Sequence, residues 1–338
     1  MTSPLDLDPL APPQKREHPV LQASEDRLPE GYEELNCYSR IIVDEARRRG
    51  IDVEILDPHL GELVLSRAGR SVTTLESLSE LTSAVAFRRC QDKLHTRNVL
   101  ERAGLAVPPG RLATGDDADR EFLDGCEGIV VKPARGEGGS GVTVGVVDLE
   151  GLSRAVEDAR AVWPQVLLER SCHGEDLRIV VIGGEVVAAS IRRPPAVVGN
   201  GRDRVVELIE ALSEERSQIT SGASRVPVDE TTFDAVRAQG WDIDSVLPAG
   251  EVLAVRGTAN VHTGGTIHDV TERLHPQLAA VALRAATAIN IPVIGLDLIV
   301  PSVEGTEYVI IEANEQPGLA YHEPQPTAQR FVDLLFPS

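Results

Sequence analysis

The sequence predicts a mixed α/β (α+β) protein, with a small N-terminal α/β domain ahead of a larger α+β domain. Short β-branched runs alternate with amphipathic helical stretches along its 338 residues, and a glycine-rich turn joins two β-like runs within residues 129–147. Near the end, apolar runs at 293–300 and 308–314 are each interrupted by polar or acidic residues. Because domains commonly hold about 100 to 200 residues, this length predicts about two of them.

Composition and charge exclude several classes of protein. The net charge of −20 argues against a broad nucleic-acid or anionic-membrane surface. No apolar run has transmembrane length, and no stretch resembles a signal peptide. The four cysteines lack the spacing of a zinc site and fit a reducing compartment. We therefore expect a cytoplasmic protein that binds neither nucleic acid nor membrane, and that holds any anionic ligand with a local positive cluster.

The first 88 residues predict a tail and a small α/β domain. Residues 1–20 are rich in Pro and Asp and lack a sustained period, which indicates a flexible tail. Within residues 21–88, apolar positions at helical spacing predict a helix over 33–49 that Gly50 ends. The remaining expected elements are a strand at 52–56, a hairpin formed by 63–65 and 71–75, and a mostly helical stretch at 78–100.

The stretch Ile129–Val147 has the features of a phosphate-binding loop. A β-like run ends at Lys132, and glycines follow that permit positive φ and a close approach of backbone N–H groups to an anion. Walker and Rossmann loops lead into a helix, whereas the following VTVGVV predicts a strand. An ordinary Gly-rich hairpin is the alternative. The candidate phosphate-binding residues of the loop are Gly136, Gly138, Gly139, Ser140 and Gly141.

Lysine is rare in this chain. Of its 33 Lys and Arg residues, only Lys15, Lys93 and Lys132 are lysines. Arg carries a planar fork and Lys a compact charge, so a chain that otherwise uses Arg can keep Lys where only an ammonium fits. A GC-rich genome would explain the scarcity, but it would not explain why Lys132 lies at the glycine loop. For Lys93, an exposed position on a helix is the alternative.

The middle of the chain alternates strands, helices and polar loops. Arg192 and Arg193 open a Pro- and Gly-rich loop that leads into a helix, where surface charge is their alternative role. A polar loop over 257–271 contains Asn260 and two histidines, His262 and His268, which we leave outside the catalytic core because lone histidines in such loops are usually solvated. The expected regular elements are strands at 166–170, 177–182, 186–191 and 252–256, and helices at 152–163 and 276–289.

The last two expected strands carry candidate metal ligands. Asp297 interrupts the run 293–300, and Glu312 and Asn314 interrupt the run 308–314. Carboxylates are costly to bury unless they are paired or bind a cation, and hard oxygen ligands suit Mg²⁺ shared with phosphates. The spacing of two places Glu312 and Asn314 on one face of a strand. The alternative is that these residues end their strands and face water.

The order of these motifs resembles the ATP-grasp ligases, over about residues 88–335. The similar stretches are Lys93, the loop at Lys132, VLLER, RRPPAVVGNGRDRVVELIE, RGTANVHTGG, GLDLIV and IIEANEQPG. Within that family, the sequence is similar to the ATP-grasp halves of cyanophycin synthetase and N-acetylglutaminylglutamine synthetase. The resemblance implies an ATP-grasp domain over 89–338, with a lid subdomain at about 105–170, behind a pre-grasp domain at 21–88. The resemblance does not include the acetyltransferase half of N-acetylglutaminylglutamine synthetase.

The resemblance also implies a role for each candidate residue. Lys93 and Lys132 hold the α- and β-phosphates of ATP, and the loop from Gly136 to Gly141 covers the γ-phosphate. The adenine pocket contains Glu169, and Glu175 or a nearby acid binds the ribose. Two Mg²⁺ ions are bound by Asp297, Glu312 and Asn314. The acyl phosphate and the later oxyanion are neutralised by Arg193, Arg256 and Asn260.

The expected function is an ATP-dependent ligase that forms an amide or peptide bond through an acyl phosphate. Its partners are a small carboxylate and a small amine, and the favoured case is a dipeptide such as N-acetylglutaminylglutamine. Two alternatives stay open: an ATP-grasp enzyme that modifies a peptide or protein side chain, and a non-catalytic nucleotide-binding regulatory module. Similar ligases are often dimers or tetramers, so by analogy we expect a homo-oligomer.

Overall fold

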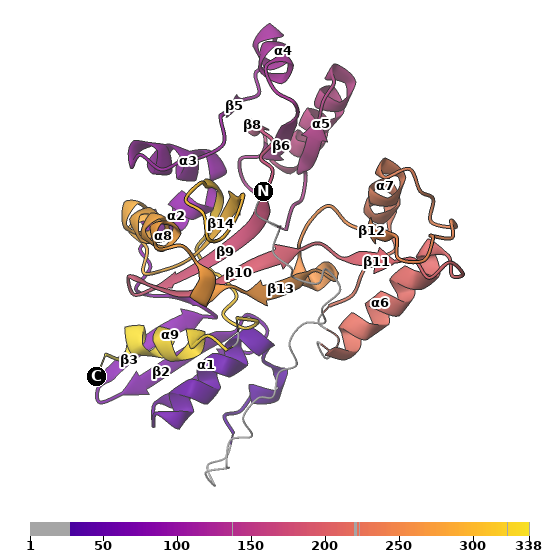
Figure 1. The fold of residues 1–338 in the computed structure, drawn as a ribbon. Coiled ribbons are helices and arrows are strands. Elements are labelled where there is room, and N and C mark those ends of the chain that lie inside the picture. The colour runs from indigo at the N-terminus through magenta and orange to yellow at the C-terminus, as the bar shows by residue number, and fades with distance from the viewer. Residues whose placement is uncertain (1–27, 137, 220–221, 223, 323, 338) are drawn as a thin grey trace. The chain divides into compact units, whose positions relative to one another are not determined.

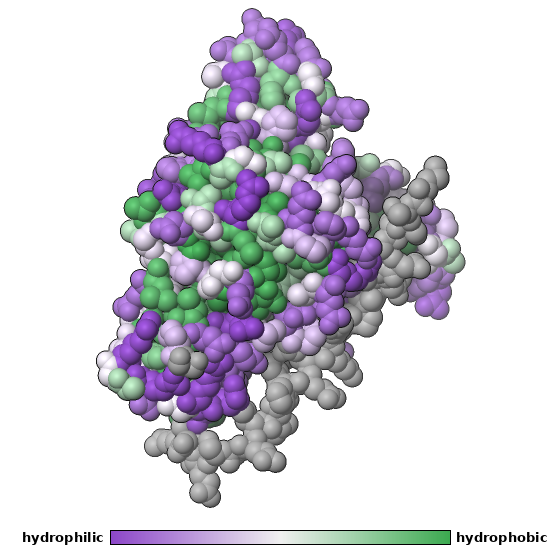
Figure 2. Space-filling view, turned by 60° about the vertical axis from the view of Figure 1, so that its left-hand side comes forward, coloured by the Kyte–Doolittle hydropathy of each residue, from purple (hydrophilic) through white to green (hydrophobic). Residues whose placement is uncertain are grey.

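The computed structural model describes residues 28–337 except 137, 220, 221, 223 and 323 (Figure 1). The predicted tail, residues 1–20, lies outside the described residues. The described chain forms two compact units: unit 1 comprises residues 190–269, and unit 2 comprises residues 28–189 and 270–337. On the face shown in Figure 2, hydrophilic residues predominate and hydrophobic residues form smaller groups between them. None of the helices described here is long and apolar enough to cross a membrane.

Unit 2 begins with an antiparallel sheet and a helix. The sheet has the order β1-β2-β3-β4, and the predicted hairpin is confirmed, with the turn at Ala68 and Gly69. The predicted first helix starts later than expected, because the Asn36 side chain accepts a hydrogen bond from the Ser39 N–H and so caps the helix at Cys37. The elements are a 3₁₀ turn (Tyr32–Glu34), α1 (Cys37–Arg48), β1 (Asp52–Asp57), β2 (Glu62–Arg67), β3 (Arg70–Leu75) and β4 (Leu78–Ser79).

The prediction of a mostly helical stretch at 78–100 is confirmed, although the stretch is divided. That region contains β4 and two separate helices, α2 (Ala84–Gln91) and α3 (Lys93–Arg102). Ser83 accepts from the Ala86 N–H and starts α2, and Asp92 accepts from the His95 N–H and starts α3. The two caps divide the periodic pattern, and they place Lys93 at the first position of α3.

The main sheet of unit 2 contains the predicted strands β9 (Glu175–Ile182), β14 (Val293–Val300) and β15 (Val309–Asn314), together with the unit 2 part of β10 (Glu185–Arg193). Its order is β10-β9-β14-β15. Gly183 and Gly184 form the predicted two-residue turn, both with positive φ, as a type I′ turn requires. Helix α8 (Pro276–Ile289) agrees with the prediction and packs against β9 and β14.

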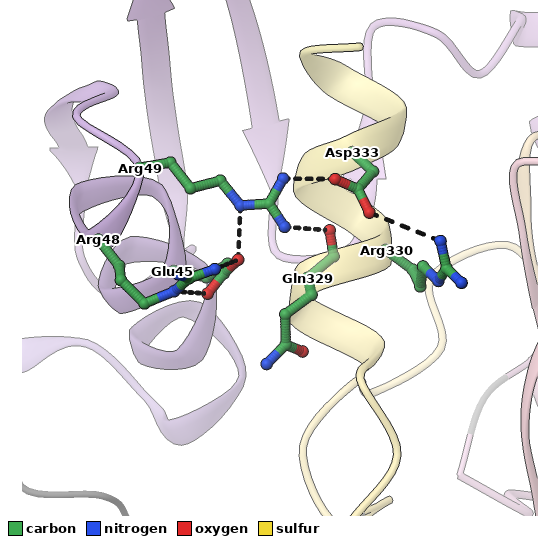
Figure 3. Close-up of polar contacts among 6 residues, drawn as sticks. All are labelled: Glu45, Arg48, Arg49, Gln329, Arg330 and Asp333. Atoms are coloured by element: carbon green, nitrogen blue, oxygen red, sulfur yellow. Dashed lines mark hydrogen bonds and ion pairs between the residues drawn. The ribbon is translucent and has the colours of Figure 1, made fainter. Parts of the chain in front are cut away.

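A helix that the sequence analysis did not anticipate, α9 (Thr327–Leu335), packs on α1 and β9. Its Phe331 is fully buried in a core that also contains Ile42 and Leu63 from the N-terminal segment and Val180 from β9. At the rim of this contact, Arg49 donates to Asp333 and to the carbonyl oxygen of Gln329 (Figure 3). The first segment thus shares its core with the main sheet, and the domain boundary at residue 88 stays a prediction.

A second antiparallel sheet of unit 2 carries the glycine loop. Its order is β5-β8-β6-β7, and the loop joins β6 to the antiparallel strand β7. The prediction that a strand, and not a helix, follows the glycine loop is therefore confirmed. Helix α5 packs on this sheet through Leu152, Ala155 and Ala159. The elements are β5 (Gly110–Leu112), α4 (Asp117–Asp124), β6 (Ile129–Pro133), β7 (Thr143–Val146), α5 (Leu149–Val162) and β8 (Val166–Arg170); β5 and α4 were not predicted.

Unit 1 has its own small core, which includes Val197, Ile209, Val236 and Leu253. The polar loop predicted at 257–271 is partly wrong, because β13 (Thr266–Asp269) within it pairs with the unit 1 part of β10. The other elements are β11 (Ala196–Val198), β12 (Val252–Ala254), α6 (Val205–Ile219), the unpredicted α7 (Glu230–Ala238) and a 3₁₀ turn (Val261–Thr263); another 3₁₀ turn (Thr271–Arg273) belongs to unit 2.

Candidate active site

Unit 2 contains a cavity of about 810 Å³ between the glycine loop, the start of α3 and the end of β15. This volume suits a ligand of nucleotide size, since small-molecule sites commonly measure about 300–1,000 Å³. The predicted residues that line it are Lys93, Lys132, Gly136, Gly138, Gly139, Ser140, Glu169, Glu312 and Asn314. Residues far apart in the sequence therefore meet in one place.

The two lysines reach the cavity from different elements, and each pairs with an acid. Lys132, near the end of β6, is 5% exposed, and its Nζ lies 2.6 Å from Glu169 Oε2. Lys93 donates from Nζ to the Gly136 carbonyl oxygen at 2.8 Å and lies 3.1 Å from Glu312 Oε1. Its backbone N–H donates to the Ala134 carbonyl oxygen at 2.8 Å, so the base of the glycine loop is attached to α3.

The glycine loop has the backbone geometry that the sequence predicts. Gly136, Gly138, Gly139 and Gly141 all have positive φ, which L-residues rarely adopt. At Gly141 there is also no room, because a Cβ would lie 2.9 Å from Val162 Cγ2. Gly141 itself packs on the last turn of α5 and is absent from the cavity lining. Phosphate binding by the loop stays a prediction.

The candidate metal ligands lie on neighbouring strands. Asp297 on β14 is directly opposite Glu312 on β15, and Asn314 Nδ2 lies 3.4 Å from Asp297 Oδ2. Arg178, opposite Asp297 on β9, donates to both of its carboxylate oxygens, with Nη2 at 2.9 Å from Oδ2. Glu312 and Asn314 line the cavity, and Asp297 adjoins them without lining it.

These three side chains fit Mg²⁺ by their chemistry, because carboxylate and amide oxygens are hard ligands. The carboxylates are charge-balanced by Arg178 and Lys93 in this structure. Among the described residues no group of three His, Cys, Asp or Glu side chains is arranged to hold a metal ion. The expected metal-ligand set is not such a group, because it has only two carboxylates and its third member, Asn314, is an amide.

The remaining nucleotide candidate, Glu175, lies at the start of β9 opposite Val300 and does not line the cavity. Arg135, Trp163 and Cys172 do line it, and sequence analysis missed them. Burial, with the Glu169 charge, raises the pKa of the Cys172 thiol, and burial above all raises the pKa of Cys90 at the same cavity to about 12. All four cysteines of the chain are free thiols, as expected.

Unit 1 holds the three candidates for acyl phosphate binding. Arg193 ends β10, and the backbones of Arg193 and Asn260 pass so close to Gly265 that its Cβ would lie within 3.0 Å of both carbonyl oxygens. The Asn260 side chain accepts from the His262 N–H at 2.9 Å and caps a 3₁₀ turn. The structure therefore brings the Arg193 and Asn260 backbones together.

Arg256 of unit 1 is engaged by an acid. Its Nη1 lies 2.6 Å from Asp229 Oδ1 and 3.1 Å from Thr232 Oγ1. Burial raises the pKa of Asp229, but the Thr232 N–H bond and the Arg256 charge together outweigh it, so the pKa lies below its ordinary value. A substrate anion would have to compete with Asp229 for this guanidinium.

Comparison with known proteins identifies the fold. Residues 90–226 match the family model of the RimK-like ATP-grasp domain. Cyanophycin synthetase from Nostoc sp. is 31% identical over 320 residues, which cover 90% of this chain and 35% of that protein. The glutathione biosynthesis bifunctional protein of Clostridium perfringens is 28% identical over 327 residues, which cover 90% of this chain and 42% of that protein. The chain therefore spans less than half the length of these curated relatives.

Among solved structures, a bifunctional glutathione synthetase from Pasteurella multocida superposes with a TM-score of 0.65 and 24% identity. The superposition covers 90% of this chain and 45% of that chain. This chain therefore has the ATP-grasp fold and contains a RimK-like ATP-grasp domain at residues 90–226.

Proposed function

We propose that this protein is an ADP-forming ligase that uses ATP to join a carboxylate to an amine. The observation that carries the proposal is the shared cavity: two lysines, a positive-φ glycine loop and two oxygen ligands from β15 all line it. A phosphoryl-transfer site requires mainly positioning and charge stabilisation, and these residue types supply both.

In the first step, a substrate carboxylate oxygen attacks the γ-phosphorus of ATP, and the bond to the β–γ bridging oxygen breaks. The products are an acyl phosphate and ADP. Lys132 and Lys93 bind the phosphates, which requires each ammonium to share its present acid partner with the nucleotide. The backbone N–H groups of the glycine loop bind the γ-phosphate.

Mg²⁺ is the expected metal, held by Asp297, Glu312 and Asn314, and when bound it supplies positive charge at the phosphate oxygens. Two ions are proposed on the strength of the resemblance. Arg178, which donates to Asp297, orients that carboxylate.

In the second step, the amine attacks the acyl carbon, an amide bond forms, and inorganic phosphate leaves as the amine releases a proton. For Arg193, Arg256 and Asn260 we keep the roles that the resemblance implies, namely neutralising the acyl phosphate and the tetrahedral oxyanion. Arg193→Met tests this assignment: we expect kcat for ADP release to fall about 10²-fold while ATP binding is retained.

The favoured product is a small dipeptide such as N-acetylglutaminylglutamine. Two features support a small amino-acid substrate: the C-terminal stretch from Ile310 resembles N-acetylglutaminylglutamine synthetase, and relatives are named for cyanophycin synthesis and glutathione biosynthesis.

The test is ADP release by the purified protein with Mg-ATP against a panel of acids and amines that includes N-acetylglutamine and glutamine. Lys132→Ala is the inactive control. Turnover that needs one acid and one amine, and that Lys132→Ala abolishes, supports the ligase. ATP binding without turnover across the panel favours a regulatory module, and turnover only with a peptide favours side-chain modification.

A further inference from the structure

Arg97 is a buried arginine beneath the candidate nucleotide cavity. It lies on the inner face of α3 with Thr96 and Leu100, and its side chain is 10% exposed. Its Nη1 donates to the Pro108 carbonyl oxygen and lies 3.5 Å from Glu169 Oε1, and its Nη2 lies 2.7 Å from Glu101 Oε1. Burying such a charge is costly unless it has partners.

Glu169 is therefore shared between two cations. Oε1 faces Arg97, and Oε2 faces Lys132 at 2.6 Å. Gly110 leaves the room for this arrangement, because a Cβ there would lie 2.8 Å from Glu169 Cγ and 3.0 Å from Arg97 Nη1. The fit at Gly110 shows that Glu169 and Arg97 are closely packed, and Lys132 joins them through its ion pair with Glu169.

The charges around the cavity explain why a second cation matters. Lys93 pairs with Glu312, Arg135 pairs with Asp92 at 3.0 Å, and Lys132 pairs with Glu169. Each of these pairs has no net charge, although the proposed ligand is a polyphosphate. Adding Arg97 gives the Lys132–Glu169 cluster a net positive charge, because its other acid, Glu101, is 47% exposed and screened by water.

We propose that Arg97 is a positioning residue for nucleotide binding: it balances Glu169, so that the Lys132 ammonium keeps an uncompensated positive charge for the phosphates. The inference rests on the proposed function, since it assumes that the cavity takes ATP. Arg97 acts through Glu169 and Lys132 and is absent from the lining of the large cavity.

A purely structural role makes a different prediction. If Arg97 only supports the Pro108 segment, its loss should weaken every nucleotide equally, adenosine included. If Arg97 balances Glu169 and so leaves the positive charge of Lys132 uncompensated, the loss of affinity in its absence should grow with the number of phosphates on the ligand. The series adenosine, AMP, ADP and ATP therefore separates the two roles.

The experiment measures Kd for these four ligands by calorimetry at a fixed Mg²⁺ concentration, with Arg97→Met, Arg97→Lys and wild type. The matched control is Arg102→Met, an exposed arginine on the same helix. We expect Arg97→Met to weaken ATP about tenfold, ADP less, and adenosine under about twofold. We expect Arg97→Lys to restore most of the affinity and Arg102→Met to change none of it.

A second arm does not depend on the stability of Arg97→Met. In the double variant Arg97→Met/Glu169→Gln both charges are removed, so the cluster regains the net charge of the wild type. We expect this protein to bind ATP about threefold or more tightly than Arg97→Met does. Equal losses across the series, or no recovery in the double variant, overturn the inference alone. A wild-type protein that binds no nucleotide overturns the proposed function and this inference with it.

Discussion

The candidate nucleotide cavity and the contact between α1 and α9 use charge in opposite ways. In the cavity, the Lys132 and Glu169 side chains are each only 6% exposed. At the α1–α9 contact, ion pairs such as Arg49–Asp333, at 20% and 48% exposure, lie at the rim (Figure 3), and the interior belongs to Phe331 and its apolar neighbours. Apolar residues often stabilise a fold as well as a buried ion pair does. The buried charges of the cavity are therefore better explained by a charged ligand than by stability.

The largest expected effect comes from breaking the apolar contact. Phe331 is fully buried, and Phe331→Ala removes a ring that packs on both the N-terminal segment and the main sheet. We expect the free energy of unfolding to fall by about 3–5 kcal/mol, measured by urea denaturation. The KM for ATP should stay near the wild-type value at temperatures where the variant is folded. If Phe331→Ala lost ATP affinity and kept its stability, the α1–α9 contact would serve ligand binding and not stability, which contradicts the comparison.

The next prediction removes a charge from the cavity, where the previous one removed an apolar ring from the α1–α9 contact. Lys132→Met keeps much of the side-chain volume and removes the ammonium. We expect kcat for ADP release to fall by about 10²–10³, because the proposed phosphate-binding charge at the end of β6 is lost. Glu169 keeps Arg97 as a partner, so the loss of stability should be smaller than for Phe331→Ala. Full activity in Lys132→Met would contradict the assignment of this cavity.

Sequence patterns predicted the parts of this site that depend on local structure. The strand–glycine loop–strand at Lys132 follows from β-branched residues on both sides of the glycines, and the shared face of Glu312 and Asn314 follows from their spacing of two. The Gly183–Gly184 turn is likewise local, since only the backbone of two residues decides it.

The pairings between side chains could not be predicted, because they depend on strand register. Val130 lies opposite Glu169, and this register places Lys132 diagonally across from that acid. In the same way, Asp297 meets Arg178 because β14 and β9 align them directly. The division of the stretch at 78–100 was missed for another reason: the capping bonds of Ser83 and Asp92 compete with a continuous helical pattern.

Two glycines of the loop allow a matched test of backbone strain against packing. Gly138 and Gly141 have similar positive φ, 64° and 68°, but a Cβ finds open space at Gly138 and meets Val162 at Gly141. We expect Gly138→Ala to cost about 1 kcal/mol and Gly141→Ala about 2 kcal/mol or more, in thermal or urea unfolding. Equal losses would mean that the contact with α5 adjusts without cost.

The smallest expected effect concerns the charged rim of the α1–α9 contact. Glu45 accepts hydrogen bonds from Arg48 and Arg49. Burial raises the pKa of Glu45, but these bonds and charges outweigh it, so its pKa in the folded protein lies below the ordinary value. A lowered carboxyl pKa adds stability above the unfolded-state value of about 4.3, and this contribution disappears as the pH falls through the folded-state value.

Glu45→Gln should therefore lower the free energy of unfolding by about 1 kcal/mol at pH 7, and the difference from wild type should shrink as the pH falls below about 4. The control is Glu54→Gln, an exposed acid on β1, for which we expect little difference at any pH. A difference for Glu45→Gln that is constant with pH would show that its shape matters and its charge does not. In that case the rim would resemble the apolar interior beneath it, and the contrast with the cavity would be sharper still.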